Sequence, residues 1–247
     1  MTALGEQLAA VASFDDHYRA DYLDSKTTRA EGDPFEISLL FESVFAGARS
    51  QSVSRRYREA AETVLRQHES DIKNRWDSTA DGLSDDQLRE ALVDAGLTNQ
   101  YDRQMVVDIV TLLGELDGQS ITDYVVTELE SRAAEEMFDR FQAVQNIGPK
   151  KATLYLRDIV VVHDLEAHIQ PDDYRYLFPV DTWVHRVGRR LGIVDTADPD
   201  WRANSESLVR ACTEQDISPL AFNQGAWYLG ANAFDLVIDH VETLAAE

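Results

Sequence analysis

The sequence predicts an all-α protein, and three features of its 247 residues support that prediction. Residues with high helix propensity dominate the chain, and apolar residues recur at helical spacing rather than in alternation. Only six prolines are present, so few helices would be interrupted. The best β-strand candidate, residues 160–162, continues the helical period of the residues before it. A chain of this length forms one large helical domain or two smaller lobes with a shared core.

Helical segments are expected along the chain in order, separated by turn-forming residues. The first covers residues 4–23 and is followed by a turn cluster in which Asp33 is a natural N-cap before Pro34. Amphipathic segments then continue to residue 162, and a less regular stretch covers 163–177. The expected separators are 81–82, 98–99, 117–118 and a turn at 145–148, and the C-terminal helices are expected through Leu208, Trp227 and Val241.

The turn before residue 149 has the composition of a tight helical hairpin. Residues 138–144 and 152–162 are apolar at helical spacing, so the short polar segment between them connects two helices. Asn146 tolerates a left-handed backbone, Gly148 adopts one freely, and Pro149 fits the first turn of a helix. The free amides and the positive dipole end of that helix favour an anion such as a DNA phosphate. Taken alone, the turn is equally typical of a purely structural hairpin.

A second motif lies downstream, at residues 178–186. It places Asp181 directly before the helix that starts at Thr182. Aspartate is a favoured N-cap, so capping is one role for this carboxylate and catalysis is the other. In combination, Lys150 beside the phosphate-binding turn and Asp181 at the start of a further helix indicate covalent chemistry on DNA.

These two motifs resemble the helix-hairpin-helix signature of the endonuclease III superfamily of DNA glycosylases. The matching patterns are Ile-Gly-x-Lys-x-Ala at 147–152 and Val-Asp-Thr-x-Val-x-Arg-Val at 180–187. Residues 33–40 resemble the Asn-Pro-Phe-Glu-type opening of that family's helical barrel, and 46–54 occupy the place of its DNA-inserting loop. A weaker match to the family pattern is Gly96-Leu97 followed by Arg103. The resemblance runs in order from about residue 33 to 230.

The resemblance implies a two-lobed helical DNA glycosylase fold with the helix-hairpin-helix motif between the lobes. Residues 1–32 would be an N-terminal helix that packs with the C-terminal lobe. Residues 33–162 would form the helical barrel lobe that ends in the hairpin, and 163–247 the C-terminal lobe that carries Asp181. The DNA would lie across the cleft between them.

The resemblance also implies the catalytic residues. Lys150 matches the family's catalytic lysine, because it falls midway between Gly148 and Ala152, and Asp181 matches the catalytic aspartate. The amine of Lys150 must be neutral to attack the sugar, and burial near the positive helix end would favour that form. Asp181 would stabilise the developing oxocarbenium ion. The simpler alternative for Lys150 is a surface lysine that grips a phosphate.

The implied DNA contacts come from two places. In the hairpin, the backbone of Asn146, Ile147, Gly148 and Pro149 would contact the DNA, and Lys151 would contact a phosphate. A flipped base leaves a gap in the stack, which Arg49 or Gln51 would fill. An ordinary polar turn between helices is the alternative for that loop. Trp183, Trp227 and Tyr228 are candidates for the pocket wall or for core, and Arg186 for a family contact or for bracing the fold.

Two features bear on the substrate. Lys150 and Asp181 are 31 positions apart, which is longer than in endonuclease III and similar to the archaeal glycosylases that remove 8-oxoguanine. The sequence pattern around Asp181 is closer to that of endonuclease III, whose substrates are oxidised pyrimidines. Three functions are therefore expected: a base excision repair glycosylase and abasic-site lyase acting on oxidised bases, an archaeal-type 8-oxoguanine glycosylase and lyase, or a non-catalytic DNA-binding relative.

Composition sets the remaining expectations. The net charge of −22 opposes DNA binding, but two of the four lysines lie in the hairpin. A chain rich in acids and poor in lysine resembles proteins of halophilic archaea, and in molar salt the screening length falls to roughly 3 Å. With Cys212 alone, the chain lacks the four-cysteine iron–sulfur loop of many relatives, and Cys212 is expected to be buried.

The partner set and location follow from the same data. The expected partner is double-stranded DNA with a damaged base or abasic site. No membrane partner is expected, and the N-terminus lacks signal-peptide features. No metal is expected, because Glu166, His168 and Asp172 lack a fixed ligand spacing. No cofactor is expected. The chain is expected to be a cytoplasmic monomer.

Overall fold

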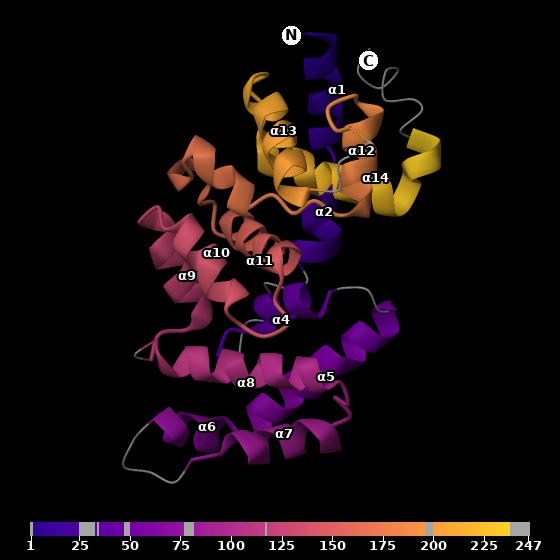
Figure 1. Ribbon diagram of the computed structural model, residues 1–247. Helices are drawn as coiled ribbons and strands as arrows, with labels where there is room; N and C mark the ends of the chain where they lie inside the picture. Colours follow the sequence, from indigo (N-terminus) through magenta and orange to yellow (C-terminus); the bar gives the residue numbers. More distant parts are fainter. Residues whose placement is uncertain are drawn as a thin grey trace. The chain divides into compact units, whose positions relative to one another are not determined.

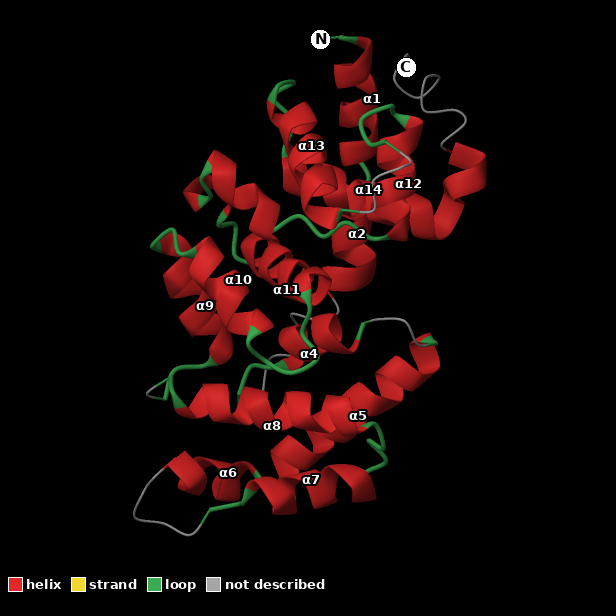
Figure 2. Cartoon of the chain, viewed as in Figure 1, coloured by secondary structure: helices red, strands yellow, loops and turns green. Residues whose placement is uncertain are grey.

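The structure is a computed structural model that describes residues 2–24, 33, 35–46, 50–76, 82–116, 118–195 and 200–237. Every regular element in these ranges is a helix, and they contain no strand (Figure 2). The predicted all-α class is therefore confirmed for the described part of the chain. None of the helices within these ranges combines the length and apolar character that crossing a membrane requires.

The chain divides into two compact units. Unit 1 combines Met1–Ser25 with Glu166–Glu247, and unit 2 is Lys26–Leu165. Lys150 belongs to unit 2 and Asp181 to unit 1.

Unit 2 is a helical assembly in which α11 packs against α4, α9 and α10, while α8 packs against α6 and α7 (Figure 1). The Phe141 and Tyr155 rings, 5.0 Å apart, join α10 to α11 in its core. The helices of this unit are α4 (Ser38–Phe45), α5 (Gln51–Gln67), α6 (Glu69–Trp76), α7 (Asp85–Asp94), α8 (Gln100–Gly114), α9 (Ile121–Glu130), α10 (Ala134–Gln142) and α11 (Pro149–Val162).

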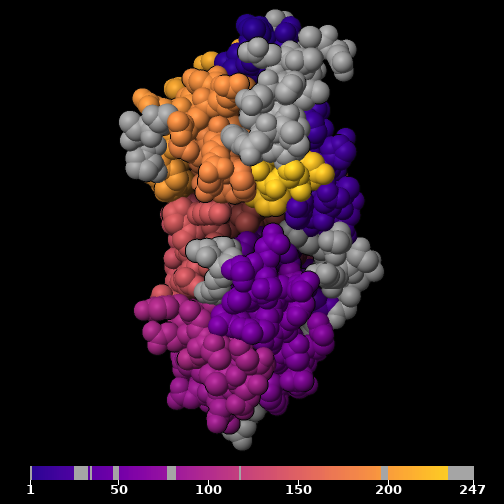
Figure 3. All heavy atoms as spheres, turned by 90° about the vertical axis from the view of Figure 1, so that its right-hand side faces the viewer, coloured from indigo at the N-terminus to yellow at the C-terminus, as the bar shows by residue number. Residues whose placement is uncertain are grey.

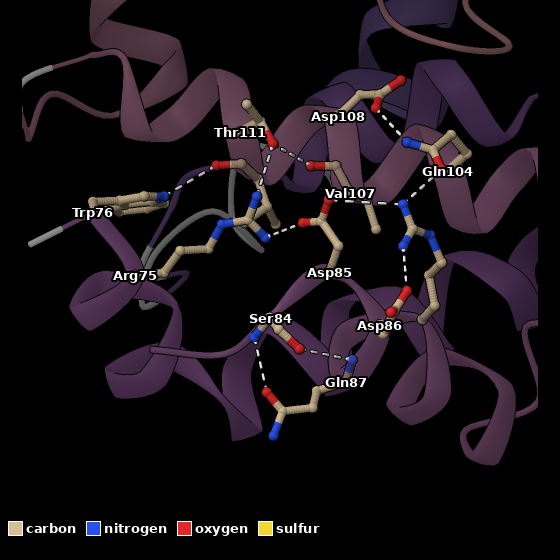
Figure 4. A network of polar contacts seen from close by, with 12 residues as sticks. Arg75, Trp76, Ser84, Asp85, Asp86, Gln87, Gln104, Val107, Asp108 and Thr111 are labelled. Carbon is tan, nitrogen blue, oxygen red and sulfur yellow. Dashed lines mark hydrogen bonds and ion pairs between the residues drawn. The ribbon is translucent and has the colours of Figure 1, made fainter. Parts of the chain in front are cut away.

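Polar contacts join α6 and α7 to α8 (Figure 4). Arg75 of α6 forms an ion pair with Asp85 of α7 and donates to the Thr111 hydroxyl of α8 at 3.1 Å. The indole N–H of Trp76 donates to the carbonyl oxygen of Val110 at 3.2 Å. Helix α7 itself starts with a capping box, in which Ser84 and Gln87 satisfy each other's backbone N–H groups. These contacts fix α8, the helix that supports the candidate site.

Unit 1 is organised around its last helix, which packs against α1, α2, α12 and α13. The indigo N-terminal residues and the yellow C-terminal helix therefore lie side by side, although some 200 residues separate them (Figure 3). The elements of this unit are α1 (Ala3–Ala12), α2 (Asp15–Tyr18), the π-helical η1 (Arg19–Leu23), the 3-10 helices η2 (Glu166–His168) and η3 (Pro171–Tyr176), α12 (Thr182–Arg190), α13 (Trp201–Thr213) and α14 (Pro219–Val237).

Two glycines allow α14 to approach its neighbours closely. A Cβ atom at Gly225 would lie 1.9 Å from the backbone oxygen of Val11, so α1 could not keep its position. A Cβ atom at Gly230 would lie 2.4 Å from the Cβ atom of Trp183 on α12. Glycine at these positions therefore sets the distance between α14 and its two partners.

Two expectations are corrected in detail. The first expected helix, residues 4–23, is interrupted at Ser13 and Phe14, between α1 and α2. Asp33 does not cap a helix at residue 34: its carboxylate accepts from the N–H of Phe35 and from the N–H and hydroxyl of Ser38, where α4 begins. Pro34 itself lies outside the described residues.

The less regular stretch 163–177 contains η2 and η3, and Glu166 is more than a solvated loop residue there. Its carboxylate oxygen accepts from the hydroxyl groups of Tyr174 at 3.1 Å and Ser218 at 2.6 Å. Burial, together with the charge of Glu166, raises the pKa of Tyr174. Glu166 thus ties η2 and η3 to the start of α14.

Candidate functional site

The hairpin between α10 and α11 has one of its two predicted boundaries. Pro149 is the first residue of α11, as predicted, whereas α10 ends at Gln142, two residues before the expected end at Val144. Asn146 has the predicted left-handed backbone, with φ of 64°. The expectation for Gly148 is wrong, because its φ of −90° and ψ of 177° are extended values that any residue adopts. The left-handed step of the turn is therefore made by Asn146 alone.

Two carboxylates of α8 hold this turn. The buried Asp102 accepts a hydrogen bond from the side-chain amide of Asn146 at 2.7 Å. Asp108, one and a half turns further along, accepts from the backbone N–H of Gln145 at 2.9 Å. Neither aspartate was singled out by the sequence. Their partners lie 44 and 37 positions away, so no local pattern marks the contact.

A polar chain continues behind Asp108. Its second oxygen accepts from the Gln104 side chain at 2.7 Å, as Figure 4 shows. Gln104 in turn accepts from Arg89 of α7 at 3.0 Å, and Arg89 also pairs with Asp86. Asp108 is thereby fixed from both sides. The hairpin is held on a rigid support, which is the condition for a precise binding turn.

The front of α11 is open to a ligand. Among the described residues, no acceptor is present for the backbone N–H groups of Gly148 and Lys150. A Cβ atom added at Gly148 would have no heavy atom within 4 Å, so nothing inside the chain requires glycine there. Glycine does permit an outside group to approach the backbone closely. Together with the helix dipole, these amides form a place that suits an anion.

The two lysines of the hairpin differ in their contacts. Lys150 is exposed at the second position of α11 and has no hydrogen-bond or ion-pair partner within the described residues. The expected burial of Lys150 is therefore wrong for the protein on its own. Lys151 is partly exposed and donates from its ammonium group to the carbonyl oxygen of Asn146 at 2.8 Å. Its charge is thus held beside the turn, while the amine of Lys150 is available.

Ile147 and Pro149 complete the hairpin. Ile147 is buried, and its N–H donates to the carbonyl oxygen of Val144 at 3.1 Å. Its side chain therefore anchors the turn in unit 2, and only its backbone is left for an outside partner. Pro149 is partly exposed at the first position of α11.

Asp181 is the N-cap of α12 in unit 1. One carboxylate oxygen, Oδ1, accepts from the backbone N–H groups of Trp183 at 2.9 Å and Val184 at 3.0 Å. The capping alternative is thereby confirmed. The second oxygen, Oδ2, has no hydrogen-bond or ion-pair partner in the described part of the chain, and the residue is partly exposed. Capping and a second role are compatible, because they use different oxygens.

The residues that follow Asp181 are ordered by packing. Trp183 lies against Gly230 of α14, and the guanidinium of Arg186 lies 5.0 Å from the centre of the Trp183 ring. The Arg186 side chain is exposed on the surface of unit 1. Trp227 packs edge-on against Tyr22 at 4.8 Å. Trp227 therefore belongs to an aromatic cluster inside unit 1, as the core alternative predicts.

The loop before α5 is shorter than expected. Helix α5 already begins at Gln51, so residues 51–54 are helical and do not belong to the expected loop. Gln51 is exposed in the first turn of α5. Arg49 lies outside the described residues.

Gln224 of α14 was also not singled out by the sequence. Its side chain is buried, yet neither the amide oxygen nor the amide nitrogen has a hydrogen-bond partner among the described residues. The neighbouring Asn223 donates to the carbonyl oxygen of Pro179 at 2.9 Å. A buried amide without partners is costly, so Gln224 is a residue whose presence the packing alone does not explain.

The described ranges contain no group of three or more His, Cys, Asp or Glu side chains placed to hold a metal ion. Cys212 is fully buried, as predicted, and burial raises the pKa of its thiol to about 12.

Comparisons of the chain with protein-family models, with curated proteins and with solved structures give no significant match. The resemblance to DNA glycosylases therefore rests on the quoted motifs and on the chemistry of the residues themselves.

Proposed function

We propose that the chain binds double-stranded DNA through the hairpin and acts as a DNA glycosylase with abasic-site lyase activity. In this proposal it is a two-lobed, endonuclease III-like enzyme of base excision repair. Lys150 is the nucleophile and Asp181 the electrostatic partner. The double-stranded DNA carries an oxidised base or an abasic site, and one copy of the chain is sufficient.

The distribution of charge carries the DNA-binding part of the proposal. Although the chain has 45 acidic residues, none occurs in three long intervals, and each interval holds three or four basic residues. They are 43–58, 140–157 and 182–194, and they coincide with the loop before α5, the hairpin and the helix after Asp181. A fourth acid-free interval, 217–234, holds no basic residue, so only these three combine the absence of acids with positive charge. This combination supports a nucleic-acid partner in spite of the net charge.

The hairpin supplies the matching local chemistry. Its open amides, the glycine without internal neighbours and the two lysines are the groups that phosphate binding uses. Asp102 and Asp108 contribute indirectly, because their hydrogen bonds with Asn146 and Gln145 fix the turn.

The proposed reaction uses each group once. The Nζ atom of Lys150 forms a bond to C1′ of the damaged nucleotide, and the bond from C1′ to the base breaks with its electron pair leaving on the base. The proton lost from Nζ goes to the departing base. The C1′–O4′ bond then breaks, O4′ takes a proton from water, and a C1′=Nζ Schiff base forms. Water removes a C2′ proton, the C2′–H electron pair forms a C2′=C3′ bond, and the 3′ phosphate leaves with the electron pair of the C3′–O bond. The free Oδ2 atom of Asp181 stabilises positive charge on the sugar, while Oδ1 keeps the carboxylate aligned.

A second candidate is a DNA-binding protein without lyase activity. The exposure of Lys150 favours it, since an exposed lysine at the start of a helix suits phosphate binding. In this case both lysines of the hairpin bind phosphates.

Borohydride trapping on a duplex with one abasic site, in molar potassium chloride, distinguishes the two candidates. Borohydride reduces the Schiff base to a stable amine, so a lyase becomes covalently attached to the DNA. We expect an adduct with the wild type and with Lys151→Gln, and no adduct with Lys150→Gln. The adjacent lysine is a matched control because both variants remove the same charge from one turn.

Absence of an adduct with folded, DNA-bound wild type would favour the non-catalytic candidate. An adduct that survives Lys150→Gln would refute the nucleophile assignment. For an active protein, duplexes with 8-oxoguanine or an oxidised pyrimidine then decide between the two proposed substrate classes.

A further inference from the structure

Helix α12 presents an arginine face to solvent. Its buried positions are Val184, Val187 and Gly188, and they face the core of unit 1. On the opposite side, Arg186 is followed one turn later by Arg189 and Arg190, and all three are exposed. Positions three and four apart lie on the same helix face, so these side chains are neighbours.

The segment that carries this face contains arginines and no acidic residue. No acidic residue occurs between Asp181 and Asp195, whereas the neighbouring α13 mixes Arg202 and Arg210 with Glu206. Arg189 forms no ion pair within the described part of the chain.

The first arginine of the face is oriented by aromatic packing. Its guanidinium lies over the Trp183 ring at 5.0 Å, a cation–π contact. Trp183 is itself held against Gly230, where no side-chain atom could fit. The Arg186 guanidinium is thereby oriented on the surface, about one turn after Asp181.

We propose that the arginine face of α12, made of Arg186, Arg189 and Arg190, binds the phosphates of one strand of duplex DNA. This inference rests on the proposed DNA-binding function and adds a contact surface in unit 1 to the hairpin of unit 2. Arg186 and Arg190 are about 6 Å apart along the helix axis, at 1.5 Å per residue. That interval spans about two phosphates, at about 3.4 Å of duplex axis per phosphate on one strand.

The position of the face gives it a purpose. It starts one turn after Asp181, on the same rigid helix, so phosphates bound there hold a strand in register with the carboxylate. Arginine suits this task because its guanidinium donates two parallel hydrogen bonds to one phosphate. Arg189 and Arg190 also lie in the last turn, where positive charge stabilises the helix dipole, so the test must measure binding separately from stability.

The experiment measures the binding of an undamaged fluorescent duplex by anisotropy at several potassium chloride concentrations. The test variant is the pair Arg186→Gln with Arg189→Gln. The matched control is the pair Arg202→Gln with Arg210→Gln, because both arginines are exposed on another helix of unit 1 and the net charge changes equally. Circular dichroism at each salt concentration verifies that every variant is folded.

Each lost phosphate contact lowers the slope of log affinity against log salt by about 0.9. We expect the test pair to lower the slope by about 1.8 and the control pair to leave it unchanged. Arg186→Lys with Arg189→Lys should restore the slope, since lysine keeps the charge. This second pair also answers the case in which the glutamine pair does not fold.

Three results would overturn the inference. Equal slopes for the wild type and the test pair would exclude phosphate contacts at this face, and equal losses in both pairs would indicate a general effect of net charge. A wild type that binds single-stranded RNA but not duplex DNA would assign the face to another partner. The proposed function is tested separately: loss of binding in Lys150→Gln with Lys151→Gln, but not in the test pair, supports the hairpin and refutes the arginine face alone.

Discussion

Replacing Asp181 separates its capping role from the proposed catalytic one. The carboxylate caps α12 through Oδ1, which accepts two backbone N–H groups, and its charge is proposed to act through Oδ2. Asparagine caps nearly as well as aspartate, whereas alanine does not cap. Asp181→Asn therefore removes the charge and keeps the cap, and Asp181→Ala removes both.

The magnitudes differ for the two roles. Loss of an N-cap costs about 1 kcal/mol, and loss of the charge at a helix start costs a few tenths of that. Asp181→Ala should therefore lower the free energy of unfolding by about 1 kcal/mol, and Asp181→Asn by much less. If the charge stabilises the transition state, both variants should lose about 10²-fold or more in lyase rate.

The assay combines urea unfolding with single-turnover cleavage of an abasic duplex. If Asp181→Ala and Asp181→Asn differ in stability but lose the same lyase activity, the result supports separate roles for Oδ1 and Oδ2 of Asp181. Wild-type cleavage by Asp181→Asn would refute the reasoning, because the charge would then have no part in the reaction.

Four further outcomes are expected. Asp102→Ala should lower the free energy of unfolding by about 2 kcal/mol and weaken duplex binding, because the hydrogen bond from Asn146 to a buried carboxylate is lost; urea unfolding and anisotropy check this, and unchanged binding would contradict the brace. Gln224→Met should raise stability by about 1–2 kcal/mol in urea unfolding, because it removes a buried amide without partners; a destabilised variant would mean that the amide is satisfied. The Cys212 thiol, buried and with its pKa raised to about 12, should react with a maleimide only after unfolding, so fast labelling of the native protein would be the contrary result. Added potassium chloride should raise the thermal midpoint, since a net charge of −22 is self-repelling at low salt; a falling midpoint would contradict this.

The local features of the fold could be predicted from the sequence. Pro149 begins a helix, Asn146 takes the left-handed step, and Asp181 caps α12, because each depends on the chemistry of a residue and its immediate neighbours. The all-helical class and the burial of Cys212 follow from composition and apolar spacing in the same way. These features need no information about distant parts of the chain.

The supports of the candidate site could not be predicted. Asp102 and Asp108 appear in the sequence as two acids on an amphipathic helix, and only tertiary packing brings them to the hairpin. The exposure of Lys150 and the extended backbone of Gly148 likewise depend on how α11 lies against α4, α9 and α10. Local sequence does not encode those distances.

Unit 1 combines residues 1–25 with residues 166–247, and this has a consequence for synthesis on the ribosome. Tyr18 of α2 packs against Trp227 of α14, so α1 and α2 cannot complete their packing until α14 has been synthesised. At about 5–20 residues per second, translation of the intervening 200 or so residues takes roughly 10–40 s. During this interval Leu8 and Val11, which are fully buried in the finished protein, have no partner from α14. Unit 2 is complete well before then, so we expect α1 and α2 to expose their apolar residues until α14 has been synthesised.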